Sequence, residues 1–444
     1  MTDPGWPKRR LHFIGIGGAG MSGLALVCHQ LGAVVSGSDR SDSTYLERLV
    51  AAGIEPALGH DEANLPDRAE VVISTAIGDD NPELALARRT GRRVLHRSDL
   101  LAELCAAKRT IAVAGTHGKT TTTGMLIWAM RELGRDPAFF VGGELPGVGP
   151  DGAAANSGWG EGEWAIVEAD ESDGSFLVLD PEIAVVTNIE MDHHSRWSGL
   201  AELRAAFTEF ASKASGVVHP VADADLAEAL AGRDLAGYDR SRPGPAELGL
   251  LVPGEHNLLD ARAAIAALEL TGEPEAGVSR ALESFPGVRR RLEFKGEREG
   301  ARIYDDYAHH PTEVAAALSA LRGLGPERLI AVFQPHLYSR TKVFSQAFGE
   351  ALATADEIIV LDVYPAREQP VGRFEGVSGM DVVRAVADRS DGRAIWWAPD
   401  ADSAERVALS RLGSDRILVT VGAGDVTKIS DRLVQPEEPG SGQG

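Results

Sequence analysis

Short apolar strands alternate with helices along most of this chain, and this alternation limits its fold more than any other feature. Near the N-terminus, the runs LHFIGI and AVVSGS flank MSGLALVCHQLG, whose apolar residues recur at helical spacing. The same order returns from Arg109 to the helix NLLDARAAIAALELTG, and again after FPGVRRRLEF. Because strands that alternate with helices form parallel sheets, the sequence predicts an α/β fold.

Charge and cysteine content exclude several classes of function. The formal net charge of −22 argues against general binding to nucleic acid or to an anionic membrane surface. No uninterrupted apolar run reaches about 18 residues, so we expect no segment that spans a membrane. The two cysteines, Cys28 and Cys105, give no disulfide framework and favour a cytoplasmic location.

A full G-x-G-x-x-G motif follows the first apolar run. Gly15, Gly17 and Gly20 supply its glycines, and Asp39 lies about twenty residues further on. A dinucleotide-binding fold places its ribose-binding acid at that distance, so the motif by itself fits an NAD enzyme. The underlying physics is more general, because it requires only a pyrophosphate at the N-terminus of a helix.

A second glycine-rich loop, AVAGTHGKTTTTG, also connects a strand to a helix. Backbone amides in such a loop point at a phosphate, Lys119 would reach the β- and γ-phosphates, and the Thr120 hydroxyl would bind Mg²⁺. Val113 stands where the usual P-loop motif has its first glycine. The alternative is that this segment is a glycine-rich loop that only connects the strand to the helix and binds no ligand.

The strand IVEADESD ends in four acids within six residues. Like charges packed this closely are costly unless a cation neutralises them, and Mg²⁺ prefers one or two carboxylates with phosphate oxygens and water. A solvated acidic loop is the alternative, but beside a P-loop we favour a metal role for Glu168. A third strand leads into His193, and His256 and Asp260 lie one helical turn apart.

Polar and cationic residues also follow strands in the last third of the chain. DDYAHHP and PHLYSRT each end a strand, and Arg289, Arg290 and Arg291 mark the junction before them. Each cluster alone is a weak signal. Together they predict an anionic second substrate.

The length of 444 residues predicts about three domains. We expect a Rossmann-like domain over 1–106, a central P-loop ATPase-type domain with a parallel sheet over 107–287, and a Rossmann-like domain over 288–434. Residues 435–444 are predicted to form a disordered tail.

Eight segments, in this order, resemble the conserved motifs of the Mur ligases: FIGIGGAGMSGLA, STAIGDDNPE, GTHGKTTTT, EADESDGSF, TNIEMDH, GEHN, DDYAHHPTE and FQPH-YSRT. The resemblance covers residues 11 to 430. DDYAHHPTE, together with the N-terminal glycine motif, is most similar to the family member that acts on L-alanine.

The resemblance implies an ATP- and Mg²⁺-dependent ligase of cytoplasmic peptidoglycan precursor synthesis. It would join L-alanine to the carboxylate of UDP-N-acetylmuramate through an acyl phosphate, as a monomer or weak homodimer. Carried over by motif, the residues that would act in catalysis are Lys119, Glu168 and His193, and those that would hold metal are Thr120, Glu168 and His193.

The same resemblance implies three binding sites. ATP would contact Gly115, Thr116, His117, Gly118, Lys119, Thr120, Thr121, His256 and Asp260. The UDP-sugar would contact Gly15, Gly17, Gly18, Gly20, Met21, Ser22, Asp39, Ser74 and Ala76. The amino acid would contact Tyr307, His309 and Arg340.

Two positions depart from the family pattern. Asp260 stands where many members have Asn, and a carboxylate cannot donate to an adenine ring nitrogen. Leu337 stands where an arginine is often found, and we hypothesise that Arg367 replaces that cation.

Three other functions fit part of the pattern. A ligase that joins UDP-N-acetylmuramate to a preformed tripeptide would share nearly every motif. An NAD-dependent dehydrogenase would not need the second phosphate loop with its acidic strand. A non-catalytic nucleotide-binding module would show no ATP turnover.

Overall fold

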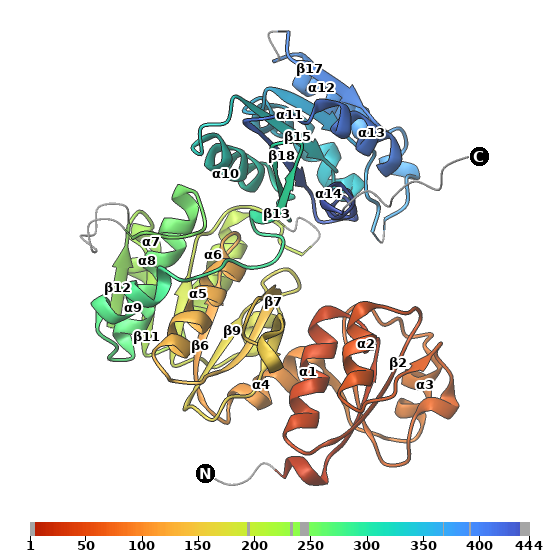
Figure 1. The fold of residues 1–444 in the computed structure, drawn as a ribbon. Helices are drawn as coiled ribbons and strands as arrows, with labels where there is room; N and C mark the ends of the chain where they lie inside the picture. The colour runs from red at the N-terminus through yellow and green to blue at the C-terminus, as the bar shows by residue number, and fades with distance from the viewer. Residues whose placement is uncertain are drawn as a thin grey trace. The chain divides into compact units, whose positions relative to one another are not determined.

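The computed structural model describes residues 5–192, 196–230, 234–239, 248–366, 368–389 and 392–435. The chain divides into two compact units. The first unit comprises 1–250 and 259–286, and the second comprises 251–258 and 287–444. The first unit contains two sheets and the second contains one (Figure 1).

The N-terminal sheet of the first unit has five parallel strands in the order β3-β2-β1-β4-β5. Its strands are β1 Arg10–Ile14, β2 Val34–Asp39, β3 Ala57–Leu58, β4 Glu70–Ile73 and β5 Val94–His96. Its helices are α1 Ala19–Gln30, α2 Thr44–Ala51, α3 Pro82–Arg89 and α4 Arg97–Cys105, with 3₁₀ turns at Trp6–Lys8 and Glu62–Asn64. Strand order reverses around β1, so the glycine motif that follows β1 opens where α/β sheets bind ligands.

The second sheet of this unit has seven strands in the order β12-β11-β10-β6-β9-β7-β8. They are β6 Arg109–Ala114, β7 Ala138–Leu145, β8 Ala155–Gly158, β9 Trp164–Glu168, β10 Ile183–Val186, β11 Gly216–Pro220 and β12 Asp234–Tyr238. The helices are α5 Lys119–Glu132, α6 Leu200–Ser212, α7 Ala224–Ala229, α8 Glu255–Leu270 and α9 Glu275–Leu282, with 3₁₀ turns at Pro150–Gly152 and Ser175–Val178.

Strand β6 lies between β9 and β10 and is parallel to both. These three strands carry the P-loop, the acidic motif and the TNIEMDH motif at their carboxyl ends. These three motifs therefore lie at one edge of the sheet, as far as the described residues show.

The second unit has six strands in the order β13-β14-β18-β15-β16-β17, parallel except for the β13–β14 pair. They are β13 Glu293–Arg298, β14 Ala301–Asp306, β15 Arg328–Phe333, β16 Glu357–Val360, β17 Ala394–Trp397 and β18 Arg416–Val421. The helices are α10 Pro311–Arg322, α11 Tyr338–Leu352, α12 Gly379–Ala387, α13 Ala401–Arg411 and α14 Thr427–Val434, with a 3₁₀ turn at Gly372–Phe374.

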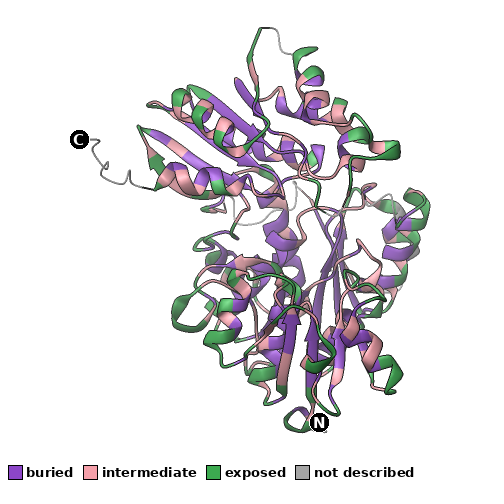
Figure 2. Cartoon of the chain, turned by 90° about the vertical axis from the view of Figure 1, so that its right-hand side faces the viewer, coloured by how far each residue is buried: buried purple, intermediate pink, exposed green. Residues whose placement is uncertain are grey.

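Burial explains why the central strands read as continuous apolar runs. Residues 110–114 of β6 and 183–186 of β10 are all buried, whereas helices such as α6 and α13 keep an exposed outer face (Figure 2). Helices on both faces of a parallel sheet remove its strands from water on both sides. The buried apolar residues therefore form the cores that fix the strand ends.

The predicted three-domain α/β fold is confirmed, and some strands differ from the sequence-based expectation. The apolar run VVISTAI (71–77) is a strand only as far as Ile73, because residues 74–77 form a turn in which the Ile77 N–H donates to the Ser74 carbonyl (3.1 Å). The antiparallel strands β8 and β13 were not predicted. The domain boundaries at 106, 287 and 434 stay a prediction, and the predicted tail lies outside the described residues except for Gln435.

Candidate active site

The P-loop occupies residues 115–118, between β6 and α5. Gly118 begins the helix from a left-handed conformation (φ 82°), and Gly115 has φ 139°, so both turns favour glycine. A Cβ at Gly115 would collide with the Thr187 hydroxyl, and a Cβ at Gly118 would lie 2.5 Å from Asp260 Oδ1. The loop therefore has no room for side chains at these two positions.

The segment after β10 holds the P-loop from its other side. The His117 backbone N–H donates to Asn188 Oδ1 (2.9 Å), and the Thr116 hydroxyl donates to the Glu190 carbonyl (2.9 Å). The His117 imidazole also lies 3.1 Å from a carboxylate oxygen of Glu190. Thr116 and His117 thus shape the loop through these contacts.

Lys119 lies inside this loop. Its ammonium donates to the Gly115 carbonyl (2.6 Å) and the Thr116 carbonyl (3.1 Å), and it pairs with Glu171 Oε2 (2.9 Å). Burial opposes the charge on Lys119, but Glu171, Asp170 and neighbouring Glu168 outweigh it and raise the lysine pKa. The lysine is therefore held as a cation at the point where the P-loop would receive a phosphate.

Glu171 is only 1% exposed. Burial raises its pKa to about 7, although the positive charge of Lys119 works in the opposite direction. The sequence singled out the acidic run but favoured Glu168 within it. The structure shows that Glu171 is the acid that contacts Lys119.

Thr120 and Glu168 face each other across the start of α5. The Thr120 hydroxyl donates to Glu168 Oε1 (3.0 Å), and the Gly142 N–H on β7 donates to Glu168 Oε2 (2.7 Å). A hydroxyl and a carboxylate are hard oxygen ligands, which suit Mg²⁺. Two of the three predicted metal ligands, Thr120 and Glu168, are thus adjacent, next to the P-loop, and Thr121 follows Thr120 buried in α5. His193 lies outside the described residues.

The N-terminal glycine motif forms a tight loop before α1. Gly15 has φ 78°, and the Gly17 N–H donates to Asp39 Oδ2 (2.8 Å). Asp39 therefore supports the glycine loop in this structure. Gly18 is the N-cap of α1, and the first N–H groups of a helix have no acceptor within it, as an anion site requires.

The other residues predicted to contact the UDP-sugar differ in whether their side chains are available to a ligand. Met21 and Ser22 are buried, and the Ser22 hydroxyl donates to the Ala19 carbonyl (3.1 Å), so their side chains serve the fold. Ser74 and Ala76 form the turn after β4, where the Ala76 N–H donates to Ser74 Oγ (3.4 Å). This turn lies beside the end of β1, since β1 and β4 pair in parallel.

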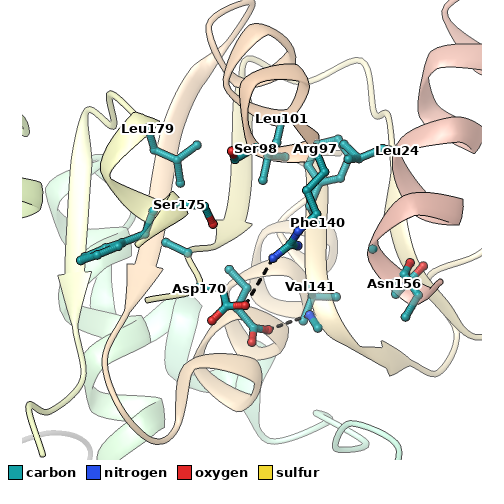
Figure 3. A pocket seen from close by; sticks show the side chains of 16 residues that line it. Leu24, Arg97, Ser98, Leu101, Phe140, Val141, Asn156, Asp170, Ser175 and Leu179 are labelled. Carbon is teal, nitrogen blue, oxygen red and sulfur yellow. Dashed lines mark hydrogen bonds and ion pairs between the residues drawn. The ribbon is translucent and has the colours of Figure 1, made fainter. Parts of the chain in front are cut away.

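A cavity of about 190 Å³ in the first unit is lined by Gly20 of the N-terminal glycine motif and by Glu168, a predicted metal ligand. Figure 3 shows Arg97 pointing towards Asp170 beside this cavity. Motif reasoning identified Gly20 and Glu168 but missed Arg97, Gly142 and Asn156. The lining residues are Ala19, Gly20, Leu24, Arg97, Ser98, Leu101, Phe140, Val141, Gly142, Asn156, Glu168, Ala169, Asp170, Ser175, Phe176 and Leu179.

His256 and Asp260 both lie on α8, as predicted. Asp260 is buried against Gly118 of the P-loop. Burial lowers the pKa of His256 to about 4, and the charge of Arg291 acts in the same direction. His256 is therefore a neutral imidazole near pH 7.

The predicted amino-acid residues lie close together in the second unit. The Tyr307 and His309 rings are 5.5 Å apart, the His309 and His336 rings are 6.0 Å apart, and Arg340 Nη1 lies 3.4 Å from His336 Nδ1. His336 also stacks on Tyr364 at 5.7 Å. The structure thus gathers one buried arginine, two imidazoles and two phenol rings at the carboxyl edge of this sheet.

Leu337 adopts φ 70°, an uncommon conformation for a residue with a branched side chain. Its backbone makes the turn into α11, with its N–H donating to the Tyr364 carbonyl (2.9 Å) and its carbonyl accepting from the Thr341 N–H (3.0 Å). Leu337 gives this region no cation. Arg367, the hypothesised replacement, lies outside the described residues.

Family comparisons agree with this arrangement along nearly the whole chain. The Mur ligase family catalytic domain matches residues 10–109, the Mur ligase middle domain matches 113–241, and the Mur ligase glutamate ligase domain matches 290–424. A UDP-N-acetylmuramate–L-alanine ligase of Nocardioides sp. is 46% identical over 435 residues, covering 96% of this chain and 95% of its own length. The enzyme of the same name from Rubrobacter xylanophilus is 42% identical and covers 96% and 99%.

Solved structures show the same similarity. UDP-N-acetylmuramate-alanine ligase MurC from Thermotoga maritima has a TM-score of 0.80 and 28% identity, covering 96% of this chain and 98% of that one. A murein peptide ligase from Psychrobacter arcticus has a TM-score of 0.68 and 25% identity, with the same coverage. The predicted resemblance is confirmed: this chain belongs to the Mur ligase family.

Proposed function

We propose that this protein joins L-alanine to the carboxylate of UDP-N-acetylmuramate, with conversion of ATP to ADP and phosphate, in peptidoglycan precursor synthesis. One observation carries the proposal. A P-loop lysine and threonine face a buried acidic strand end in a chain that aligns over 96% of its length with ligases named for this reaction.

The chemistry explains why a phosphate loop is needed. A carboxylate is a poor electrophile, so one of its oxygens attacks the γ-phosphorus of ATP, giving an acyl phosphate and ADP. The alanine amine, after losing a proton, attacks the acyl carbon, and phosphate leaves. The protein contributes positioning and charge neutralisation, as in other phosphoryl transfers.

Lys119 would hold the β- and γ-phosphates against the loop amides, after exchanging its contact with Glu171 for phosphate oxygens. Thr120 and Glu168, with His193, would hold Mg²⁺. When bound, that ion would offset the repulsion between the carboxylate and the triphosphate. His256 and Asp260 would lie near the adenine.

The other substrates would use the remaining clusters. The UDP diphosphate would sit on the amides of the Gly15–Gly20 loop, with Asp39, Ser74 and Ala76 near the nucleoside. Tyr307, His309 and Arg340 would receive alanine. Arg340 is the natural partner of the alanine carboxylate, because a guanidinium binds a carboxylate through two parallel hydrogen bonds.

The cellular setting is part of this proposal. ATP and a UDP-sugar are substrates of the cytoplasm, and we propose that the enzyme acts there as a monomer or weak homodimer. Within the described residues, none of the helices is both long and apolar enough to cross a membrane.

Phosphate release tests the proposal. The assay would contain UDP-N-acetylmuramate, MgATP and, in separate reactions, L-alanine, glycine, L-serine or the tripeptide. We expect release with L-alanine and its loss in Lys119→Ala. Release with the tripeptide alone would instead identify a recycling ligase, and absence of release with every acceptor would leave a nucleotide-binding module. Tight NADH binding without UDP-sugar binding would identify a dehydrogenase.

A further inference from the structure

Arg97 is the first residue of α4, and its backbone position is fixed by a capping box. The His96 N–H donates to Asp99 Oδ2 (3.0 Å), and the Ser98 N–H donates to His96 Nδ1 (3.4 Å). A helix start closed by two reciprocal hydrogen bonds has little freedom to move. The side chain of Arg97 therefore extends from a fixed backbone position.

Two carboxylates hold the guanidinium loosely. Arg97 Nη2 lies 3.4 Å from Asp170 Oδ2 and 3.6 Å from Asp173 Oδ2. Both acids already accept a shorter bond within their own loop, from the N–H groups of Ser172 (2.9 Å) and Ser175 (2.9 Å). Among the residues that the structure describes, Arg97 makes no other hydrogen bond or ion pair, so most of its five N–H donors are uncommitted.

The rest of the guanidinium lies beside the start of α1. Arg97 Nη1 is 3.4 Å from the position that a Cβ on Gly20 would occupy. Gly20 belongs to the first turn of α1, where backbone N–H groups lack intrahelical acceptors. A guanidinium and the positive end of a helix dipole thus lie side by side, and both line the same cavity.

The cavity lining carries charges of both signs. Glu168 and Asp170, at the end of β9 and just after it, line the cavity together with Arg97 and the α1 residues Ala19 and Gly20. Figure 3 shows Arg97 pointing towards Asp170. An anion in the cavity is attracted by Arg97 and by the first N–H groups of α1, and it is repelled by the two carboxylates. The Arg97 side chain is only 28% exposed, so water screens its charge less than at a fully exposed site.

From this juxtaposition, and resting on the proposed function, we infer that Arg97 is a positioning residue that binds the diphosphate of the sugar nucleotide together with the first turn of α1. Asp170 and Asp173 hold the guanidinium in place until the diphosphate arrives. A planar guanidinium suits this task, because it can contact two phosphate oxygens at once.

Arg97 would also set the distance between the N-terminal glycine motif and the end of β9. Asp170 lies two residues after Glu168, the predicted metal ligand at the end of β9. An arginine that contacts both Asp170 and the diphosphate ties the sugar nucleotide to the strand end beside which its carboxylate must be activated. A one-ångström error there would slow the chemistry substantially.

Equilibrium titration of the full-length protein with three probes, in EDTA, tests the inference. UDP carries the diphosphate without the sugar, UDP-N-acetylmuramate carries both, and uridine carries neither. In Arg97→Ala we expect UDP and UDP-N-acetylmuramate to bind more weakly by the same factor, roughly tenfold to a hundredfold, as the loss of hydrogen bonds to a charged group predicts. Uridine binding should stay unchanged, and Arg97→Lys should restore part of the loss.

Arg93→Ala is the matched control. Arg93 lies four residues earlier, is half exposed and pairs with Glu70 and Glu103 away from the cavity. It should leave all three affinities unchanged. Asp173→Asn should weaken UDP binding only a few-fold, and it should have no effect once Arg97 is alanine.

Several outcomes would overturn the inference. Loss of UDP-N-acetylmuramate binding with unchanged UDP binding would assign Arg97 to the sugar or its carboxylate. Equal loss of uridine binding in both Arg97 variants, with a lowered Tm, would make its role structural, as would unchanged binding of all three probes. A wild-type protein that binds neither UDP nor UDP-N-acetylmuramate would refute the proposed function itself.

Discussion

The ammonium of Lys119 lies 2.9 Å from a carboxylate oxygen of Glu171, and its remaining hydrogen bonds go to the P-loop's own carbonyls. The lysine expected to bind ATP phosphates is therefore committed to an acid before any nucleotide arrives. A phosphate must displace a carboxylate to reach it. This exchange makes ATP affinity sensitive to the charge on Glu171.

Glu171→Gln should lower the KM for ATP at pH 8, because the neutral amide competes less for Lys119 and does not repel phosphate. Burial raises the Glu171 pKa to about 7, so in the wild type the same gain should appear as pH falls from 8 to 6 and the acid becomes protonated. Steady-state KM for ATP across this range measures both effects. A variant whose KM retains the wild-type pH dependence would contradict the prediction.

Thr120→Val should raise the Mg²⁺ concentration needed for half-maximal activity by roughly tenfold to a hundredfold. The substitution removes a ligand hydroxyl and the hydrogen bond that orients Glu168. Thr120→Ser should keep most of the activity. Thr122→Val is a matched control two residues along α5, since within the described residues the Thr122 hydroxyl has no hydrogen-bond partner. Titration of Mg²⁺ at saturating ATP compares the three, and equal effects of both valine variants would refute a metal role for Thr120.

Gly115→Ala should unfold or strongly destabilise the central domain, by about 3 kcal/mol or more, because the new methyl group would collide with Thr187 at a positive φ. Gly134→Ala tests the conformational part alone. Gly134 has φ 72° and open space around its Cβ position, so about 1 kcal/mol is expected there. Urea unfolding of both variants measures the loss in the free energy of unfolding for each. Similar losses would contradict the prediction, because they would show that the methyl group at position 115 meets no costly collision.

Glu83 anchors a buried network in the N-terminal sheet. Burial alone would raise its pKa, but hydrogen bonds with His12, Ser38 and Asn64 outweigh it and lower the pKa to about 2. Its folded pKa is below the unfolded value, so it contributes stability above about pH 4.5 that is lost as pH falls towards 2. The shift corresponds to about 3 kcal/mol.

Glu83→Gln should therefore be less stable at pH 7 and should lose less stability on acidification than the wild type. Urea unfolding at pH 7 and at several values down to pH 3 measures this. Glu62→Gln, at an exposed acid paired with Arg89, is the control and should follow the wild-type curve. Parallel curves for Glu83→Gln and wild type would refute the assignment.

Much of the candidate site could be predicted because its pieces are local. Gly115, Gly118, Lys119 and Thr120 lie within six residues, and their geometry follows from a strand, a glycine turn and a helix start. The same holds for the Gly15–Gly20 loop, although the motif alone could not say which nucleotide it serves. Some helix ends also follow from the sequence: Asn81 is the N-cap of α3 and Pro82 is its first residue, an arrangement that favours a helix start.

The amino-acid sequence by itself determined the α/β class, the positions of the two glycine-rich loops that we expect to bind phosphate, and the family. Only the tertiary structure decided which side chains meet: Glu168 with Gly142 across 26 residues, Lys119 with Glu171 across 52, and Arg97 with Asp170 across 73. The physical reason is strand order. Buried parallel strands share one apolar pattern, so their sequences predict strands without saying which neighbours they take, and contacts between strand ends exist only once the sheet has formed.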